Sequence, residues 1–281
     1  MKSTFSIFFP LIFLSVSLTG CNLFDVSLVE YLEAGSSGEG PSGDGGSSGG
    51  GSSGGDGPPG GGTESWVYLA VSTGNNANSG LTETEAVKHF SKALDIWAAR
   101  GSTEAWIMLT ENIAVSSNYN DPQTLTATGL VDFSTNPVIP SGITAIILAG
   151  SGGGITIDNA GQPSRRVLYL TTAGKTITLR NLTITGGRGN PGGGIYIGGG
   201  GKVIMESGVI ITGNEAGQQG GGVYVDGVGS TFTMKGGEIR GNKAADASSG
   251  KGGGVCVGSN GTFVMEGGTI GKNESGNDGG G

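Results

Sequence analysis

Cysteine and histidine are almost missing from this 281-residue chain, which has two cysteines and one histidine. His89 has no cysteine or aspartate near it at ligand spacing, so the sequence predicts no metal site, and no cofactor-binding motif is found. The 15 Lys and Arg residues form no basic stripe, which argues against nucleic acid as a partner. Aromatic residues make up only 6%, and together with 61 glycines this brings the composition close to that of low-complexity chains.

Glycine, in contrast, occurs 61 times and is unevenly placed. Fifteen of the glycines lie between Ala34 and Thr63, where there is almost no apolar residue to bury. Residues 34–64 are therefore predicted to be a disordered Gly/Ser-rich linker. Most of the net charge of −8 comes from acidic residues up to residue 64, whereas the body from residue 65 carries 14 basic and 16 acidic residues.

The first 20 residues have the layout of an export signal, with Lys2 followed by an apolar run over residues 5–18. The run is too short for a comfortable membrane span. The residues that end it resemble the lipobox of bacterial lipoproteins, with a cleavage motif of Leu18, Thr19 and Gly20 before Cys21. An ordinary signal peptide is the alternative.

The lipobox resemblance implies that Cys21 carries the lipid and that residues 21–33 form the lipidated N-terminal segment. The protein would then be exported and held by membrane lipid at the bacterial cell envelope, at the outer membrane or cell surface. Acylation of Cys21 would also mean that no intramolecular disulfide stabilises the exported body, because Cys256 is the only other cysteine.

A repeat dominates the second half of the chain. Glycine triplets begin at residues 192, 220 and 252, and a last one at 279 ends the sequence within a repeat, so a fragment or a missing end is expected. Their spacings of 28, 32 and 27 residues indicate a solenoid. Three short strands per repeat fit a parallel β-helix over residues 105–281, since a propeller blade needs four strands and a longer period.

The glycine triplets are interpreted as corners, where φ is positive or the backbones of adjacent coils approach closely. Alternating runs place large apolar residues inward, as in Phe232-Thr-Met234. One equivalent position per repeat is asparagine, predicting a hydrogen-bonded structural ladder of Asn214, Asn242 and Asn273. A second set of equivalent positions predicts an exterior charge ladder of Arg180, Glu206, Lys235 and Glu266.

Residues 65–104 are predicted to cap the solenoid with a strand, Trp66 to Val71, and a helix. Thr82 and Glu85 have capping-box spacing, apolar residues follow on one face, and Gly101 can end the helix.

These residues resemble two families. The glycine triplet followed by apolar-x-x-Asn, over residues 186–281, is similar to the repeats of polymorphic outer-membrane proteins, although Gly and Ile here replace the Ala and Phe of their motifs. The stretch VYLAVSTGNNANSGLTETEAVKHFSKALDIW resembles the opening segment of secreted β-helix proteins of the pectin-lyase-like superfamily. The second resemblance implies an all-β, right-handed parallel β-helix with an N-terminal capping helix.

Two candidate sites remain. Tyr196 and Tyr224 are predicted to point outward at equivalent positions, where aromatic rings can bind sugar or protein, although tyrosine is also an ordinary exterior strand residue. Asp158 and Asn159 form the most site-like polar pair, although an Asp-Asn pair at a strand end is also a common turn.

No catalytic constellation is visible in the sequence. We therefore expect an adhesive, ligand-binding or structural surface protein whose partner is a host or matrix protein or a polysaccharide. The alternative is a secreted polysaccharide lyase or glycoside hydrolase, as found in the pectin-lyase-like superfamily. A lyase or hydrolase would need paired acids or an Arg/Asp constellation.

Overall fold

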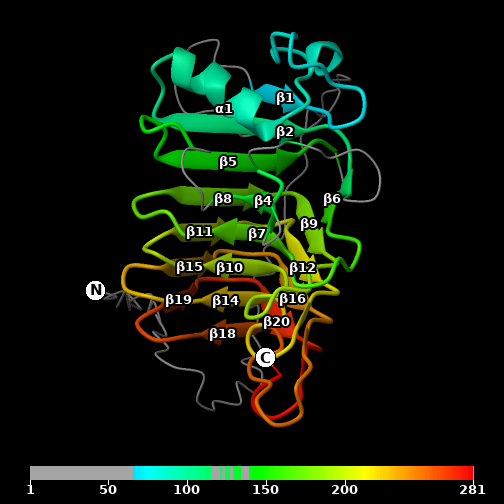
Figure 1. The fold of residues 1–281 in the computed structure, drawn as a ribbon, viewed down its shortest axis with the longest axis vertical. Helices are drawn as coiled ribbons and strands as arrows, with labels where there is room; N and C mark the ends of the chain where they lie inside the picture. Colours follow the sequence, from blue (N-terminus) through cyan, green and yellow to red (C-terminus); the bar gives the residue numbers. More distant parts are fainter. Residues whose placement is uncertain are drawn as a thin grey trace, which may run out of the picture.

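The chain folds into a solenoid of short parallel strands, seen in the computed structural model in Figure 1. The structure describes residues 66–114, 121, 124–126, 129–133, 139–152 and 154–280. The predicted signal peptide, lipidated segment and linker lie outside these residues. Every strand pair in the four sheets is parallel, so each strand of a coil lies beside its equivalent in the next coil.

The first sheet extends along the whole solenoid. Its strands, in spatial order, are β1 (Val67–Leu69), β2 (Glu104–Leu109), β5 (Ala145–Gly150), β8 (Thr176–Arg180), β11 (Lys202–Met205), β15 (Thr231–Met234) and β19 (Thr262–Met265).

The second sheet follows the first in each coil. Its strands, in spatial order, are β3 (Ile113–Ala114), β6 (Ile155–Asp158), β9 (Leu182–Thr185), β12 (Ile210–Thr212), β16 (Glu238–Arg240) and β20 (Thr269–Gly271).

The third sheet closes the coil. Its strands, in spatial order, are β4 (Gly129–Asp132), β7 (Arg166–Leu170), β10 (Ile195–Ile197), β14 (Val223–Val225) and β18 (Val255–Val257). Between the second and third sheets lies a small fourth sheet of two-residue strands, β13 (Glu215–Ala216), β17 (Lys243–Ala244) and β21 (Glu274–Ser275). Strands of two residues are too short to show an alternating pattern, so the sequence does not separate them from the loops.

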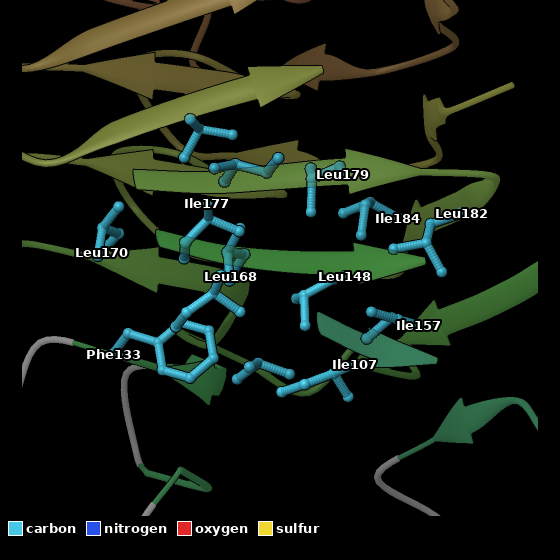
Figure 2. Close-up of a cluster of buried hydrophobic side chains, with 14 of the residues drawn as sticks. Ile107, Phe133, Leu148, Ile157, Leu168, Leu170, Ile177, Leu179, Leu182 and Ile184 are labelled. Carbon is cyan, nitrogen blue, oxygen red and sulfur yellow. The ribbon is translucent and has the colours of Figure 1, made fainter. Parts of the chain in front are cut away.

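The core is the apolar interior between the sheets. Figure 2 shows buried aliphatic side chains from successive coils filling this interior. Equivalent residues stack in register, and the rings of Phe232 and Phe263 are parallel within 14° at a centroid distance of 5.5 Å. Each such side chain contributes about 1.5–3 kcal/mol by leaving water. The inward positions inferred from the repeat alignment are core positions in the structure, except in the last described coil, where Met265, expected to point inward, is 36% exposed.

The N-terminal end of the solenoid is covered by the helix α1 (Phe90–Ala99), which packs on β1 and β2 (Figure 1). Its buried face includes Phe90, Leu94 and Trp97, and the indole of Trp97 donates a 3.0 Å hydrogen bond to the carbonyl oxygen of Trp106. The cap of strand and helix thus exists as the sequence predicted.

The helix begins later than its capping pattern suggested. Thr82 caps only a short 3₁₀ turn, η1 (Glu83–Glu85), where its hydroxyl accepts the backbone N–H of Glu85. Val87 cannot join a helix because its N–H and C=O bond to the backbone of β1, at Tyr68 and Ala70. Strand pairing therefore moves the first helical residue to Phe90.

Asp121 caps the start of α1 from a distant part of the chain. Its carboxylate, fully buried, accepts the backbone N–H and the hydroxyl of Ser91 at 3.0 and 3.1 Å. A carboxylate at this position satisfies an N–H that the helix itself leaves unpaired.

Candidate functional site

A ladder of three tyrosines crosses the outward face of the third sheet. Tyr169 on β7, Tyr196 on β10 and Tyr224 on β14 are register partners, and their ring centroids lie 4.9 and 5.6 Å apart. Tyr196 and Tyr224 were selected from the sequence, whereas Tyr169 was missed because no glycine triplet precedes it. A search for an aromatic residue between apolar neighbours, as in Leu-Tyr-Leu over residues 168–170, would have found it.

Arg166 lies over this tyrosine ladder. Its guanidinium carbon is 5.0 Å from the ring centroids of both Tyr169 and Tyr196, the arrangement of a cation–π contact. Its Nε donates a 2.8 Å hydrogen bond to the carbonyl oxygen of Pro191, which fixes the side chain. Burial lowers the pKa of the Arg166 guanidinium, while the nearby tyrosines and Asp132 act in the opposite direction.

The tyrosine ladder is only partly open to solvent. Tyr224 is 8% exposed, and Tyr169 and Tyr196 are half-buried. Burial raises the pKa of both Tyr196 and Tyr224, and Asp226 raises both further. The phenols are therefore neutral at physiological pH, so they offer ring faces and hydroxyl groups rather than charge.

The polar pair Asp158 and Asn159 forms a turn at the end of β6. The Asp158 carboxylate accepts the backbone N–H of Ala160 at 2.6 Å. Asn159 is fully buried, and its Nδ2 donates to the carbonyl oxygens of Gln162 and Arg165. The two side chains therefore hold the loop together next to Arg165.

The asparagines Asn214, Asn242 and Asn273 form a hydrogen-bonded ladder inside the solenoid. Nδ2 of Asn214 donates to Oδ1 of Asn242, and Nδ2 of Asn242 donates to Oδ1 of Asn273, at 2.9 and 3.0 Å. The backbone N–H groups of Asn214 and Asn242 donate to the same two oxygens. The ladder is a structural element, because its first two members are at most 1% exposed.

The glycine triplets make room for this asparagine ladder. The first glycine turns the corner at positive φ, as at Gly220 with φ 63°, where a Cβ would clash with the carbonyl oxygen of Val223. The third glycine faces an asparagine, and a Cβ on Gly222 would come within 3.1 Å of Asn242 Nδ2. The triplets therefore serve the corner and the ladder rather than a ligand.

The charged side chains on the exterior pair less regularly than the repeat suggests. Of the expected ladder, only the contact of Arg180 with Glu206 is an ion pair among the described residues, at 2.6 Å. His89 precedes α1, and its Nδ1 is 2.8 Å from Asn76 Nδ2. Within the described ranges, no group of three or more His, Cys, Asp and Glu side chains could hold a metal ion.

Cys256, the register partner of Tyr224, is disulfide-bonded and 2% exposed. This disulfide differs from the expectation that acylation of Cys21 leaves Cys256 without an intramolecular partner. Cys21 and the cleavage motif of residues 18–20 lie outside the described residues. None of the helices that the structure describes is long and apolar enough to cross a membrane.

One family model matches the chain and agrees with the fold. Residues 166–279 match the family model described as a right-handed beta helix region. Together with the parallel sheets, this match supports a right-handed parallel β-helix fold for the body of the protein. No curated protein and no solved structure matches the chain.

Proposed function

We propose that this chain is an exported, lipid-anchored surface protein that binds a glycan along its tyrosine ladder without cleaving it. The observation that carries the proposal is the tyrosine ladder itself, in which phenol rings repeat at 4.9 and 5.6 Å beside Arg166. Aromatic rings with a polar edge bind ligands that are apolar on one face and hydroxylated at the rim, as sugars are.

The acidic side chains of the body support binding rather than cleavage. Hydrolysis of a glycosidic bond needs two carboxylates about 5–10 Å apart across the sugar. Glu206 is in an ion pair, Asp158 is in a turn, and Asp132 is buried and accepts the Thr126 hydroxyl. Asp226 is the acid whose charge acts on both Tyr196 and Tyr224, and it would be the first residue to test if cleavage were found.

The test uses the full chain and a panel of acidic and neutral polysaccharides, with retention and newly formed sugar ends measured together. We expect retention without new ends. Replacing Tyr196 by alanine should weaken retention about fivefold, because one aromatic contact contributes about 1 kcal/mol. Tyr68→Ala is the matched control, since Tyr68 is also a half-buried strand tyrosine but lies on β1.

Three results would contradict the proposal. If no polysaccharide retains the protein, the ligand is not a glycan of the panel, and a host or matrix protein becomes the next ligand to test. If Tyr196→Ala and Tyr68→Ala weaken retention equally, the tyrosine ladder is not the binding site. New sugar ends would favour the alternative of a polysaccharide lyase or glycoside hydrolase.

The lipid anchor is tested separately at Cys21. We expect Cys21→Ser to move the protein from the detergent phase to the aqueous phase, and the mass of the N-terminal fragment to include acyl chains. The anchor requires that Cys256 is not bonded to Cys21 in the lipidated protein, because acylation and a disulfide would consume the same Cys21 thiol. An unacylated fragment that is released only on reduction would therefore overturn the anchor.

A further inference from the structure

The loop between β6 and β7, residues 159–165, contains two buried polar atoms for which the described structure offers no hydrogen-bond partner. They are Oδ1 of Asn159 and Nε of Arg165. Nε of Arg180 also lacks a bond of good geometry, but it lies 2.6 Å from Glu206 Oε2 and is neutralised there. Because buried polar atoms are nearly always satisfied, two such atoms in one short loop call for an explanation.

The backbone of this loop is held in an unusual conformation. Ala160 and Ser164 have φ values of 51° and 61°, which residues other than glycine rarely adopt. The buried Asn159 side chain maintains this conformation by donating to the carbonyl oxygens of Gln162 and Arg165. Backbone strain of this kind clusters at ligand-binding sites, and here it fixes the position of Arg165.

A second arginine lies against the same loop. The backbone N–H of Arg188, on the next coil, donates a 2.8 Å hydrogen bond to the carbonyl oxygen of Arg165. The Arg188 side chain leans over the loop, with its Nε 3.2 Å from the position that a Cβ on Gly161 would occupy. The two arginines are therefore neighbours on adjacent coils.

The two positive charges are only partly compensated. Arg188 lies 3.5 Å from Glu215, while Arg165 makes no ion pair among the described residues. Farther along the same edge of the solenoid, the charges of equivalent residues alternate in sign. Glu215 is the register partner of Lys243, and Lys243 is the register partner of Glu274. The side chains of Lys243 and Glu274 form an ion pair at 3.4 Å. The pair Arg165 and Arg188 interrupts this alternation. Asp158, the acid at the same corner, accepts the backbone N–H of Ala160 and forms no ion pair with either arginine among the described residues.

We propose that Arg165 and Arg188 bind an oxyanion: a carboxylate, sulfate or phosphate group. A guanidinium binds such groups through two parallel N–H bonds, and an oxyanion would supply the acceptor that Arg165 Nε lacks. That the oxyanion is carried on a glycan rests on the proposed function. On that basis, the site makes the protein prefer charged over neutral polysaccharides, with Arg166 and the tyrosine ladder contacting the sugar.

The first test needs no glycan. The thermal unfolding midpoint of the full chain in non-ionic detergent is measured against sodium sulfate and sodium phosphate, with sodium chloride at equal ionic strength as reference. An anion that binds a specific site raises the unfolding midpoint until the site is full, whereas the general stabilising effect of sulfate on proteins continues to grow with concentration. We expect the unfolding midpoint of the wild type to rise saturably with sulfate or phosphate. In Arg165→Gln and Arg188→Gln, the anion affinity obtained from this saturable rise should be at least tenfold weaker.

Arg240→Gln is the matched control, since Arg240 is exposed and paired with Glu238 at 2.8 Å. The proposal is overturned if the wild type shows no saturable component, or if Arg240→Gln weakens it as much as Arg165→Gln. The backbone oxygen of Arg165 is unchanged in the glutamine variant, so the contact with Asn159 is kept and the loop should fold.

The second test identifies the source of the oxyanion. Retention is compared on an acidic polysaccharide, its neutral counterpart and phosphatidylglycerol vesicles. Arg165→Gln should abolish the preference for the acidic chain and leave neutral retention unchanged, whereas Tyr196→Ala should lower both. If instead Arg165→Gln lowers only vesicle binding, the glycan source is wrong and the site binds lipid head groups. Sulfate binding without any glycan retention would overturn the proposed function but keep the oxyanion site.

Discussion

Removing Asn242 should destabilise the solenoid more than removing any exposed side chain. In the structure, Asn242 Oδ1 accepts from the backbone N–H and the Nδ2 of Asn214, while Asn242 Nδ2 donates to Ile211 O and Asn273 Oδ1. The residue is fully buried, so water cannot replace these partners. In Asn242→Ala, the backbone N–H of Asn214 is left without its acceptor inside the core.

The expected loss follows from the bonds removed. A buried donor left unsatisfied costs about 1–3 kcal/mol, and each further bond contributes about 1 kcal/mol. With the bonds that Asn242 Nδ2 donates to Ile211 O, Asn273 Oδ1 and, more weakly, Arg240 O, the free energy of unfolding should fall by about 3–5 kcal/mol. The matched control is Asn277→Ala, because Asn277 is exposed and its side chain makes one hydrogen bond, to Ser248 O, so the change should stay within about 0.5 kcal/mol.

The assay is urea unfolding followed by two signals. Far-ultraviolet circular dichroism reports on all coils, whereas tryptophan fluorescence reports on the cap, because the three tryptophans lie at residues 66, 97 and 106. In a solenoid each coil contacts only its neighbours, so the circular dichroism transition should shift more than the fluorescence transition. If Asn242→Ala unfolds within about 0.5 kcal/mol of Asn277→Ala, the asparagine ladder does not support the coils and the reasoning is wrong.

Two further predictions concern the glycine corners and the tyrosines. Gly220→Ala should lower the free energy of unfolding by at least about 1–2 kcal/mol, because φ is 63° and a Cβ would clash with the carbonyl oxygen of Val223. The control is Gly142→Ala in the same urea assay. A Cβ on Gly142 would have no atom within 4 Å, so this change should be neutral or slightly stabilising. For Tyr196, burial raises the folded-state pKa above the value of about 10 in the unfolded chain, so its stabilising contribution is complete below pH ~10 and is lost as the pH rises through the folded-state pKa. Stability measured from about pH 8 to 12 should therefore fall less steeply in Tyr196→Phe, and an unchanged slope would contradict the burial argument.

The repeat and the period-two alternation made the solenoid predictable. Because each coil repeats the same pattern, the residues that follow each glycine triplet must occupy equivalent places, and the sequence alone therefore puts Val203, Phe232 and Phe263 in one row, as the strand register confirms. Asn214, Asn242 and Asn273 align for the same reason, since like residues stack in register between parallel strands.

The cap and the candidate sites depended on contacts between distant segments. Val87 belongs to a helical pattern, yet its backbone bonds to β1, and the start of α1 is capped by Asp121, 30 residues away from Ser91. Local propensity describes only neighbours within a few residues, so it has no access to either contact.

What the sequence alone determined, then, is the coil: which residues point inward, where glycine turns the chain, and which asparagines stack, because all three are set by a local pattern that repeats. Only the tertiary structure decided what the coils bring together outside the repeat. Tyr169 joins the tyrosine ladder because β7 pairs with β10, and Arg188 reaches Arg165 because the loops at their coil corners lie one above the other. These contacts join coils whose loops differ in sequence. Which residues meet in them depends on how the chain winds, and the repeat pattern of the sequence does not contain that information.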